Sequence, residues 1–223
     1  MEISLRLKTI SHEVSGATVA DIATDHAYIP IYLCTERGIN KAIAGDVNKS
    51  PLARATHNIL RCGCQHKIET RLGYGLEKIS LGEVESVVIA GVGGCLVVEI
   101  LELEPEKTIS FNQLVLQPQS DIYKVRKCVH KIGFKIANER MVYEDGKFYT
   151  IINCELGIDD EYSEQEYMFG KILIQKQDDV LSKYLETEMR KQQNIMSKSP
   201  DLHNIEQKYE LYKEVYEHVH NSR

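Results

Sequence analysis

The sequence lacks several features that would assign it to a familiar class at once. No run of about eighteen apolar residues occurs, so no segment is expected to span a membrane as a helix. The stretch MEISLRLKTI at the start lacks the apolar centre of a signal peptide. None of the six cysteines forms a C-x-x-C pair, and no second pair stands at zinc-ligand spacing from Cys62 and Cys64. We therefore expect reduced, cytoplasmic thiols, no disulfide framework and no metal site.

A strong charge of one sign is also absent from most of the chain. The formal net charge is −6, but residues 159–223 alone hold 14 acidic and 9 basic residues. Residues 1–158 hold 19 acidic and 18 basic residues and are close to neutral. This balance argues against a generic polyanion-binding protein, while local basic patches on residues 1–158 stay open.

Strand-like and helix-like segments alternate along the first 158 residues. Apolar runs predict strands at residues 17–22, 41–46, 67–72, 84–90 and 113–117. Segments between and after them predict helices at residues 29–38, 49–63 and 122–133, with a further helix that carries Leu96, Ile100 and Leu103. Within residues 134–156, Asp145-Gly146 lies between two strand-like runs, which strongly indicates a β-hairpin.

This alternation predicts an α/β protein with a doubly wound, mostly parallel sheet of seven strands. Each strand–helix unit returns by a right-handed crossover, and the closing hairpin places an antiparallel strand at the edge. In such sheets ligands bind at the carboxyl ends of the strands, near the switch in strand order. The residues that directly follow the predicted strands are therefore the candidates for function.

A different pattern follows Gly157. Apolar residues between Met168 and Met189 predict one long helix, which SKSPD at residues 197–201 ends. Residues 202–219 repeat apolar side chains at three and four positions and predict a second helix. We expect residues 159–223 to form an antiparallel helical pair, outside a domain of residues 1–158, with the two apolar stripes packed on each other. The alternative is that the stripes bind a partner.

The stretch VADIATDHAY at residues 19–28 ends the first predicted strand with more polar residues than a buried strand needs. Asp21, Asp25 and His26 fall at the predicted ligand-binding edge, and Asp46 ends the second strand. A carboxylate at the second strand end accepts hydrogen bonds from both hydroxyls of a ribose, which implies a cofactor that contains adenosine. Small residues at the first and fourth strand ends let a ligand approach the backbone closely.

The kind of cofactor follows from what the first loop lacks. A dinucleotide requires G-x-G-x-x-G there, so that its pyrophosphate meets a helix N-terminus. The sequence has DIATDH instead, whose carboxylates repel a pyrophosphate. They suit S-adenosylmethionine, which carries a sulfonium and an ammonium group and no phosphate. The first loop therefore favours S-adenosylmethionine over NAD.

The same strand ends resemble a known family. VADIATDHAYIPIYL, AGDVNKSPLARATHNI, RLGYGLEKI, VVIAGVGG and LVLQPQSD are similar to stretches of the bacterial tRNA (adenine-22-N1)-methyltransferases. The match runs from Leu5 through the hairpin. It implies a Rossmann-like class I methyltransferase domain with a C-terminal coiled-coil extension, a tRNA substrate, and methyl transfer from S-adenosylmethionine to N1 of adenine 22.

The resemblance also implies a set of cofactor-binding residues at the ends of the first four strands. They are Asp21, Ala23, Thr24, Asp46, Val47, Asn48, Leu72, Gly73, Tyr74, Gly91, Val92, Gly93 and Gly94. Three of these depart from the family pattern. Ala23 replaces an expected glycine and Val92 a methionine, while Tyr74 stands where class I enzymes often carry an acidic residue for the adenine amino group.

The chemistry of adenine suggests the catalytic residues. N1 has an in-plane lone pair and needs no base to become a nucleophile, but the methylated ring is cationic. A carboxylate nearby would stabilise the growing charge. Asp25 is the candidate for this role, with His26 to orient it or the base and Tyr28 to stack. The alternative is that these residues only cap and begin the following helix.

N1 lies on the Watson–Crick edge, so a paired adenine must leave its stack, and the protein needs a surface for folded RNA. Lys124, Lys127 and Lys131 share one predicted helical face, with Arg126 and Lys135 nearby, and this face either binds phosphates or is merely solvated. Further candidates for RNA contact, including the target base and the tail, are Arg6, Lys8, Gln117, Lys183, Lys191 and Lys198.

Two other functions fit parts of the pattern. A nicotinamide-dependent oxidoreductase shares the sheet, but it would need the missing glycine fingerprint. A non-catalytic RNA-binding protein with a vestigial cofactor pocket is compatible with Ala23 and Tyr74. Titration with S-adenosylmethionine and NADH separates the first alternative, and an activity assay separates the second.

Overall fold

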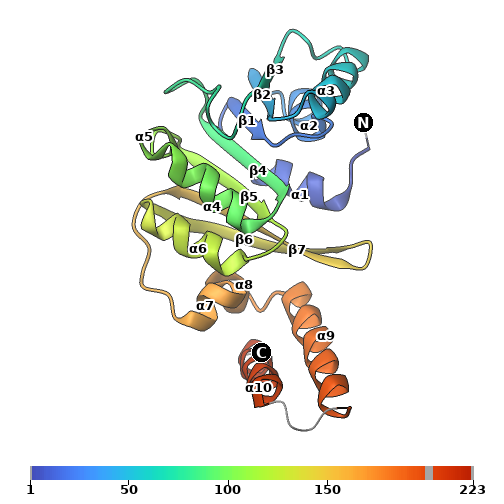
Figure 1. Ribbon diagram of the computed structural model, residues 1–223, viewed down its shortest axis with the longest axis vertical. Helices are drawn as coiled ribbons and strands as arrows, with labels where there is room; N and C mark the ends of the chain where they lie inside the picture. The colour runs from blue at the N-terminus through green and yellow to red at the C-terminus, as the bar shows by residue number, and fades with distance from the viewer. Residues whose placement is uncertain (1, 199–202, 222–223) are drawn as a thin grey trace.

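The computed structural model describes residues 2–198 and 203–221 (Figure 1). Its centre is a seven-stranded sheet with the strand order β3-β2-β1-β4-β5-β7-β6. The strands are β1 (Thr18–Ile22), β2 (Lys41–Asp46), β3 (Ile68–Leu72), β4 (Ser86–Val92), β5 (Gln113–Pro118), β6 (Phe134–Glu144) and β7 (Lys147–Leu156). The order reverses between β1 and β4, which places the predicted switch point beside β1. The doubly wound sheet predicted from the sequence is therefore confirmed.

Helices cover both faces of this sheet. They are α1 (Leu5–Glu13), α2 (Tyr28–Glu36), α3 (Lys49–Arg61), α4 (Gly94–Leu103), α5 (Pro105–Thr108), α6 (Ile122–Lys131), α7 (Glu164–Phe169), α8 (Lys171–Gln175), α9 (Asp179–Met196) and α10 (His203–Asn221). Helices α1, α2 and α3 pack on one face, and α4 and α6 pack on the other. In β4, Val87 joins the core under α4 and α6, while Val88 joins the core under α1 to α3. This explains why the strand is apolar at consecutive positions.

The β6–β7 hairpin closes the sheet at one edge. Asp145 and Gly146 at its turn both have positive φ, 50° and 76°, as a two-residue turn of this kind requires. The antiparallel strand is β7, which pairs with β5, while β6 forms the edge itself. The hairpin was predicted at the edge, and the structure shows that its inner strand is the antiparallel one.

Helix α1 has no counterpart in the sequence predictions. Ser4 caps its start by accepting a hydrogen bond from the backbone N–H of Leu7. At its end, the buried Glu13 carboxylate accepts hydrogen bonds from the side chains of Arg140, Asn138 and Asn153. These contacts lower the pKa of Glu13 against the opposing effect of burial. Helix α1 is thus fixed by partners on the distant hairpin.

The tail differs from its prediction at one point. The single long helix expected between Met168 and Met189 is divided into α7, α8 and α9. Gly170, with φ of 94°, separates α7 from α8, and Gln177, with φ of 52°, precedes α9. An α-helix cannot continue through residues of positive φ, so the prediction of one helix was wrong. The SKSPD break falls partly outside the described residues.

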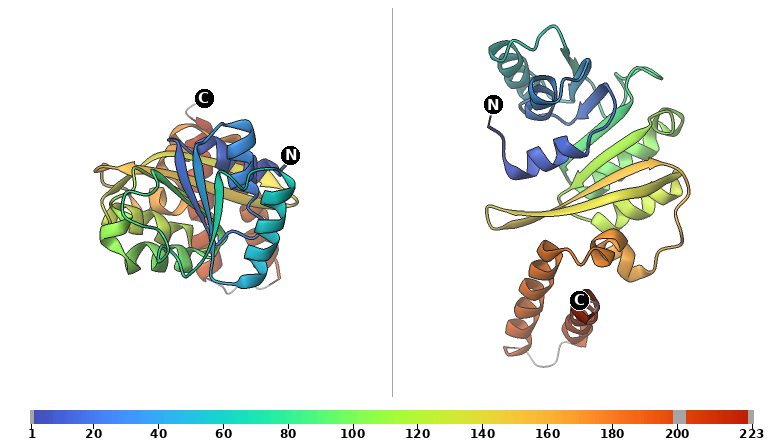
Figure 2. Two further views of the ribbon diagram at one scale, coloured as in Figure 1. Left: turned by 90° about the horizontal axis from the view of Figure 1, so that it is seen from above. Right: turned by 180° about the vertical axis from the view of Figure 1, so that it is seen from behind.

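Helices α9 and α10 run antiparallel beyond the hairpin, at the opposite end of the molecule from α3 (Figures 1 and 2). Leu181 and Leu185 of α9 and Val215 and Val219 of α10 form one apolar cluster, which Phe169 of α7 and Leu173 of α8 also join. The stripes therefore pack on each other, as the sequence predicts. Among the described residues, no helix has the length and apolar character needed to cross a membrane.

The expected boundary after residue 158 does not coincide with a gap in the packing. Tyr162 is buried in the main core, and the Asp159 carboxylate accepts a hydrogen bond from the backbone N–H of Ile136 at 2.9 Å. Residues directly after the boundary thus complete the sheet domain. We expect the separable part of the tail to begin later, near α9.

Residues on both sides of that boundary also meet at a buried ion pair. Arg126 of α6 donates to Glu139 of β6 at 2.7 Å, and each side chain is at most 1% exposed. The same guanidinium donates to the carbonyl oxygens of Tyr167 and Met168 in α7. Arg126, which the sequence places near an exposed basic face, is therefore buried and fixes α7 to the sheet domain.

Candidate functional site

A cavity of about 310 Å³ opens at the carboxyl ends of β1 and β4. The sequence predicts a ligand at this edge of the sheet. The loop from β1 into α2 and the C-terminal end of β4 form its walls, and α1 lies against it. Its lining residues are Arg6, Leu7, Asp21, Ala23, Thr24, Asp25, His26, Ala27, Tyr28, Ile29, Ala90, Gly91 and Gln119.

Asp21 is the buried carboxylate of this cavity. It is 5% exposed, lies in β1, and receives a hydrogen bond from Thr24. Burial raises the pKa of Asp21 to about 7, the Thr24 hydrogen bond opposes this, and the nearby Asp46 carboxylate adds to it. A cationic ligand would relieve both unfavourable effects. The surroundings of Asp21 therefore fit a positively charged group.

Asp46 ends the neighbouring strand β2 and is also buried. One of its carboxylate oxygens accepts a hydrogen bond from the backbone N–H of Asn48 at 2.7 Å. The exposed side chains of Val47 and Leu72 stand at the ends of β2 and β3 beside it. The second carboxylate oxygen has capacity for the hydroxyl groups of a ribose. Asp46 lies outside the lining of the first cavity, so a ligand that touched both carboxylates would extend across two strand ends.

The loop after β1 is held in a strained conformation. Ala23 has φ of 60°, a left-handed value that glycine adopts more readily. Thr24 fixes the loop on both sides, because its backbone N–H donates to Gly45 at 3.0 Å and its hydroxyl accepts from Ala27 at 3.2 Å. Ala27, with φ of 53°, then begins α2. The loop conformation explains why a glycine is expected at position 23.

Asp25, His26 and Tyr28, the three residues predicted to contact the reacting base, all line the cavity. The Asp25 carboxylate receives a hydrogen bond from Arg54 Nε of α3 at 3.1 Å and a second one from Arg54 Nη2. His26 Nε2 lies 3.2 Å from the other Asp25 oxygen. The His26 and Tyr28 rings stack at 4.9 Å with an angle of 10°. Asp25 does not cap α2, because the residue at the cap is Ala27.

Arg6 and Gln117 have different positions from those the sequence suggests. Arg6 lies in the cavity wall, where its guanidinium donates to Gln117 Oε1 at 2.6 Å and stacks on the Tyr149 ring at 5.0 Å. Gln117 is fully buried and does not line the cavity. Its role is to hold Arg6, and the lining amide is that of Gln119. Lys8 is exposed on α1.

The glycines at the end of β4 and directly after it serve two purposes. Gly91, with φ of 80°, lines the cavity. A methyl group on Gly94 would lie 2.3 Å from the Ser120 carbonyl oxygen, so this glycine is required by packing against the loop before α6. Gly93 is the N-cap residue of α4, and Val92 packs against the main core. Of these four predicted cofactor residues, only Gly91 lines the cavity.

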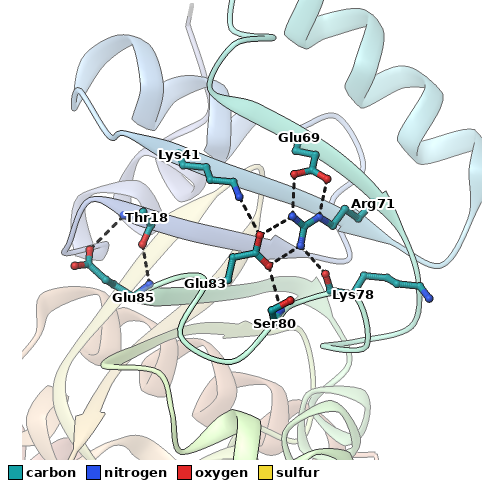
Figure 3. A network of polar contacts seen from close by, with 8 residues as sticks. All are labelled: Thr18, Lys41, Glu69, Arg71, Lys78, Ser80, Glu83 and Glu85. Carbon is teal, nitrogen blue, oxygen red and sulfur yellow. Dashed lines mark hydrogen bonds and ion pairs between the residues drawn. The ribbon is translucent and has the colours of Figure 1, made fainter.

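A polar network holds the loop after β3 (Figure 3). Arg71 donates to both oxygens of Glu83 and to the carbonyl oxygen of Lys78, and Lys41 donates to Glu83 at 2.9 Å. These contacts hold the pKa of Glu83 well below its usual range. Gly73 and Tyr74 begin this loop, and the Gly73 N–H donates to the Asp46 carbonyl at 3.1 Å. The network therefore fixes the loop beside the second carboxylate.

Known proteins resemble this chain over almost its whole length. A family model described as a methyltransferase domain matches residues 3–152. The tRNA (adenine(22)-N(1))-methyltransferase of Bacillus subtilis is 31% identical over 98% of both chains. The chain belongs to this methyltransferase family.

Two solved structures of similar chains support this assignment. A Streptococcus pneumoniae protein in complex with S-adenosyl-L-methionine has a TM-score of 0.88 and 32% identity over 96% of this chain and all of its own. The Bacillus subtilis m1A22 tRNA methyltransferase TrmK has a TM-score of 0.81 and 30% identity over 99% of this chain and 98% of its own. The similarity thus includes the tail as well as the sheet.

Two expectations for the methyltransferase site are changed by the geometry. The Tyr74 hydroxyl donates to Glu99 of α4 at 2.6 Å, so it does not point freely toward a ligand at Asp46. The three lysines of α6 each meet an acidic side chain: Lys124 with Asp121, Lys127 with Glu164, and Lys131 with Glu102. Neutralisation of all three lysines weakens the case for a phosphate-binding face on α6.

Sequence reasoning missed Arg54, Gln119 and the hydrophobic wall of Leu7 and Ile29. Arg54 lies in the helix predicted at residues 49–63, where nothing in the sequence distinguishes it from a solvated arginine. Its ion pair with Asp25 joins residues 29 positions apart, which no local pattern reveals. Among the described residues, no cluster of three or more histidine, cysteine or acidic side chains has the arrangement needed to hold a metal ion.

Proposed function

We propose that this methyltransferase transfers a methyl group from S-adenosylmethionine to N1 of adenine 22 in tRNA, in the cytoplasm. The observation that carries the proposal is the pair of buried carboxylates, Asp21 and Asp46, at neighbouring strand ends beside a cavity lined by Asp25, His26 and Tyr28. The 31% identity to a tRNA (adenine(22)-N(1))-methyltransferase supports the substrate and the position.

The carboxylates fit the cofactor better than they fit a dinucleotide. Asp21 is 5% exposed and its charged form is disfavoured by burial and by Asp46, so a sulfonium or an ammonium group stabilises it. Asp46 accepts from the ribose hydroxyls. Gly91 lets the ligand approach the β4 backbone. A pyrophosphate would be placed against two carboxylates with no glycine-rich turn, which disfavours NAD.

Bound S-adenosylmethionine supplies an electrophilic methyl group, and the chain supplies position and charge. Adenine N1 enters with its lone pair available, so no side chain has to remove a proton from it. Asp25, fixed by Arg54, stabilises the positive charge that develops on the ring, and it accepts a hydrogen bond from the exocyclic amine. The stacked His26 and Tyr28 rings offer an aromatic surface for the extruded base.

A decisive experiment measures methyl transfer to an unmodified tRNA transcript and to a transcript with guanine at position 22. The proposed function requires transfer to the first transcript only. Primer extension should stop one nucleotide before position 22, because N1-methylation blocks Watson–Crick pairing there. Transfer to both transcripts would place the reaction at another nucleotide. No transfer despite tight cofactor binding would favour the non-catalytic RNA-binding alternative, and preferential NADH binding would favour the oxidoreductase.

A further inference from the structure

Helix α3 lies in the longest segment of the chain that has no acidic residue. Residues 47–68 contain no aspartate or glutamate, the longest such run in a sequence that holds more acidic than basic residues. The run includes Lys49, Arg54, Arg61 and Lys67. A shorter acid-free run, residues 122–138, covers α6, but acidic residues from other segments pair with its exposed lysines.

Fewer of the basic side chains on α3 form ion pairs than those on α6. Lys49, His57 and Arg61 are exposed. Within the described residues, no acidic side chain lies at ion-pair distance from Lys49 or Arg61. Arg54 is paired, but its partner is Asp25 of the methyltransferase cavity. The exposed face of α3 therefore has a positive charge that complements a polyanion.

A second cavity connects this face to the first one. It has a volume of about 620 Å³ and is lined by Glu2, Ile3, Ser4, Leu7, Tyr28, Asn58, Arg61 and Cys62. Leu7 and Tyr28 line both cavities. The Asn58 side chain donates to the His26 carbonyl oxygen at 3.1 Å, so α3 also holds the loop of the first cavity. A strand of nucleic acid on α3 would thus lie beside the place where a base enters.

We propose that α3 and the second cavity form the surface on which the tRNA backbone docks, with Arg61 bound to a phosphate next to the extruded adenosine. Tyr28 separates the base in the first cavity from its neighbouring nucleotide in the second. This inference rests on the proposed function for the identity of the RNA. Binding at α3 also explains the contacts of Arg54 and Asn58, because they make docking and base positioning parts of one rigid unit.

Charge reversal at Arg61 tests the docking surface. In R61E, the KM for tRNA should rise at least roughly tenfold, while kcat at saturating tRNA and the Kd for S-adenosylmethionine stay unchanged. R61K should retain most of the affinity. A plot of log K against log salt concentration for tRNA binding should become less steep by about one unit in the neutral variant R61Q, as expected for one lost phosphate contact.

Two control variants make the result specific. R37E reverses the charge of an exposed arginine, the residue just after the C-terminal end of α2, and should leave tRNA affinity unchanged. K131E reverses the charge of the α6 lysine that is paired with Glu102. If K131E weakens tRNA binding and R61E does not, the surface lies on α6 and the proposal is wrong. Equal effects of R61E and R37E would also overturn it, since the effect would then reflect overall charge.

Fluorescence anisotropy with labelled tRNA separates this proposal from the proposed function. Wild-type protein that binds tRNA but methylates nothing would refute the proposed activity, while the R61E comparison would still decide the docking surface. Wild-type protein that fails to bind tRNA would overturn the docking surface directly. Thermal unfolding of each variant shows whether a loss of binding is a loss of folding.

Discussion

The Asp25 carboxylate in the loop after β1 is bound by the Arg54 guanidinium of α3, with Nε at 3.1 Å from Oδ1. Arg54 approaches one carboxylate oxygen, while the other lies 3.2 Å from His26 Nε2. The carboxylate is therefore oriented from both sides. Its side chain is still 58% exposed, so it stays accessible to a base in the cavity.

Replacement of Asp25 by asparagine should slow methyl transfer by about a hundredfold, the typical cost of losing a preorganised electrostatic contact. The amide keeps an oxygen that can accept from Arg54, but it lacks the negative charge that stabilises the cationic ring. Affinity for S-adenosylmethionine should stay within about twofold of wild type, because Asp25 acts on the base. The measurement is single-turnover transfer to unmodified tRNA, with cofactor titration in parallel.

Arg54→Gln is the control for this prediction. If Asp25 served mainly to hold Arg54, the two variants would slow methyl transfer by the same factor. A near-normal rate in Asp25→Asn would leave the stabilising group unidentified.

Asp21 should make the stability of the free protein depend on pH. Its pKa in the folded state is about 7, above the ordinary value of 3.8. Between these values the unfolded chain has lost a proton that the folded chain keeps, so the free energy of unfolding falls as pH rises and is then constant above pH 7. The Asp21→Asn variant has no carboxyl group here, so its free energy of unfolding does not fall in this way. It should be more stable than wild type at pH 8, by up to about 4 kcal/mol. Urea unfolding at pH 4 and pH 8 measures the difference, which should nearly vanish at pH 4.

The same carboxylate predicts the pH dependence of cofactor binding. A cationic ligand favours the ionised form of Asp21, so binding should release a proton below pH 7 and tighten as pH rises through 7. Calorimetry in buffers of different ionisation enthalpy detects the proton. Asp21→Asn should bind weakly at every pH, and an unchanged affinity would remove Asp21 from the site.

Ala23→Gly should leave the protein at least as stable as wild type. The left-handed φ of 60° at Ala23 costs about 1–2 kcal/mol for an L-residue, and glycine adopts it freely. This gain offsets the greater freedom of glycine in the unfolded chain. As a control, Ala53→Gly on the exposed side of α3 should cost about 1 kcal/mol. Equal losses in both variants would show that the loop is not strained at position 23.

Truncation tests the boundary between the sheet domain and the tail. A chain that ends at residue 158 loses the buried Tyr162, whereas a chain that ends at residue 177 retains it. Loss of a large buried side chain costs about 3–5 kcal/mol, so the shorter chain should melt roughly 6–20 °C below the longer one. Equal melting temperatures would support the boundary at residue 158. Both chains should methylate tRNA poorly if the α9–α10 pair supports the RNA.

The sheet and its ligand-binding edge follow from local sequence patterns. Strands such as β4 are apolar at successive positions because both faces are covered, and this signal lies within a few residues. Asp21 and Asp46 could be assigned to one site because parallel strands end at the same edge. The raised pKa of Asp21 could not be predicted, because it depends on burial and on the distance between the two carboxylates.

Other parts depend on contacts that sequence periodicity does not contain. Helix α1 ends at Glu13, whose partner Arg140 lies 127 positions away. Arg126 shares a helix with exposed lysines, but Glu139 and the α7 carbonyls enclose it. The break between α7 and α8 occurs at Gly170. A glycine can lie within a helix, but a residue with φ of 94° cannot, and the sequence does not reveal this angle.

The contact around Gly170 limits how this protein can be recombined with its relatives. A methyl group on Gly170 would lie 2.6 Å from Glu139 Oε2 and 2.8 Å from Arg126 Nη2. The end of α7, the edge strand β6 and α6 are therefore one packing unit, although they are separate in sequence. A chimera joined at residue 158 would take Arg126 and Glu139 from one parent and Gly170 from the other. A join just before α9 would exchange the helical pair and keep Arg126, Glu139 and Gly170 from a single parent.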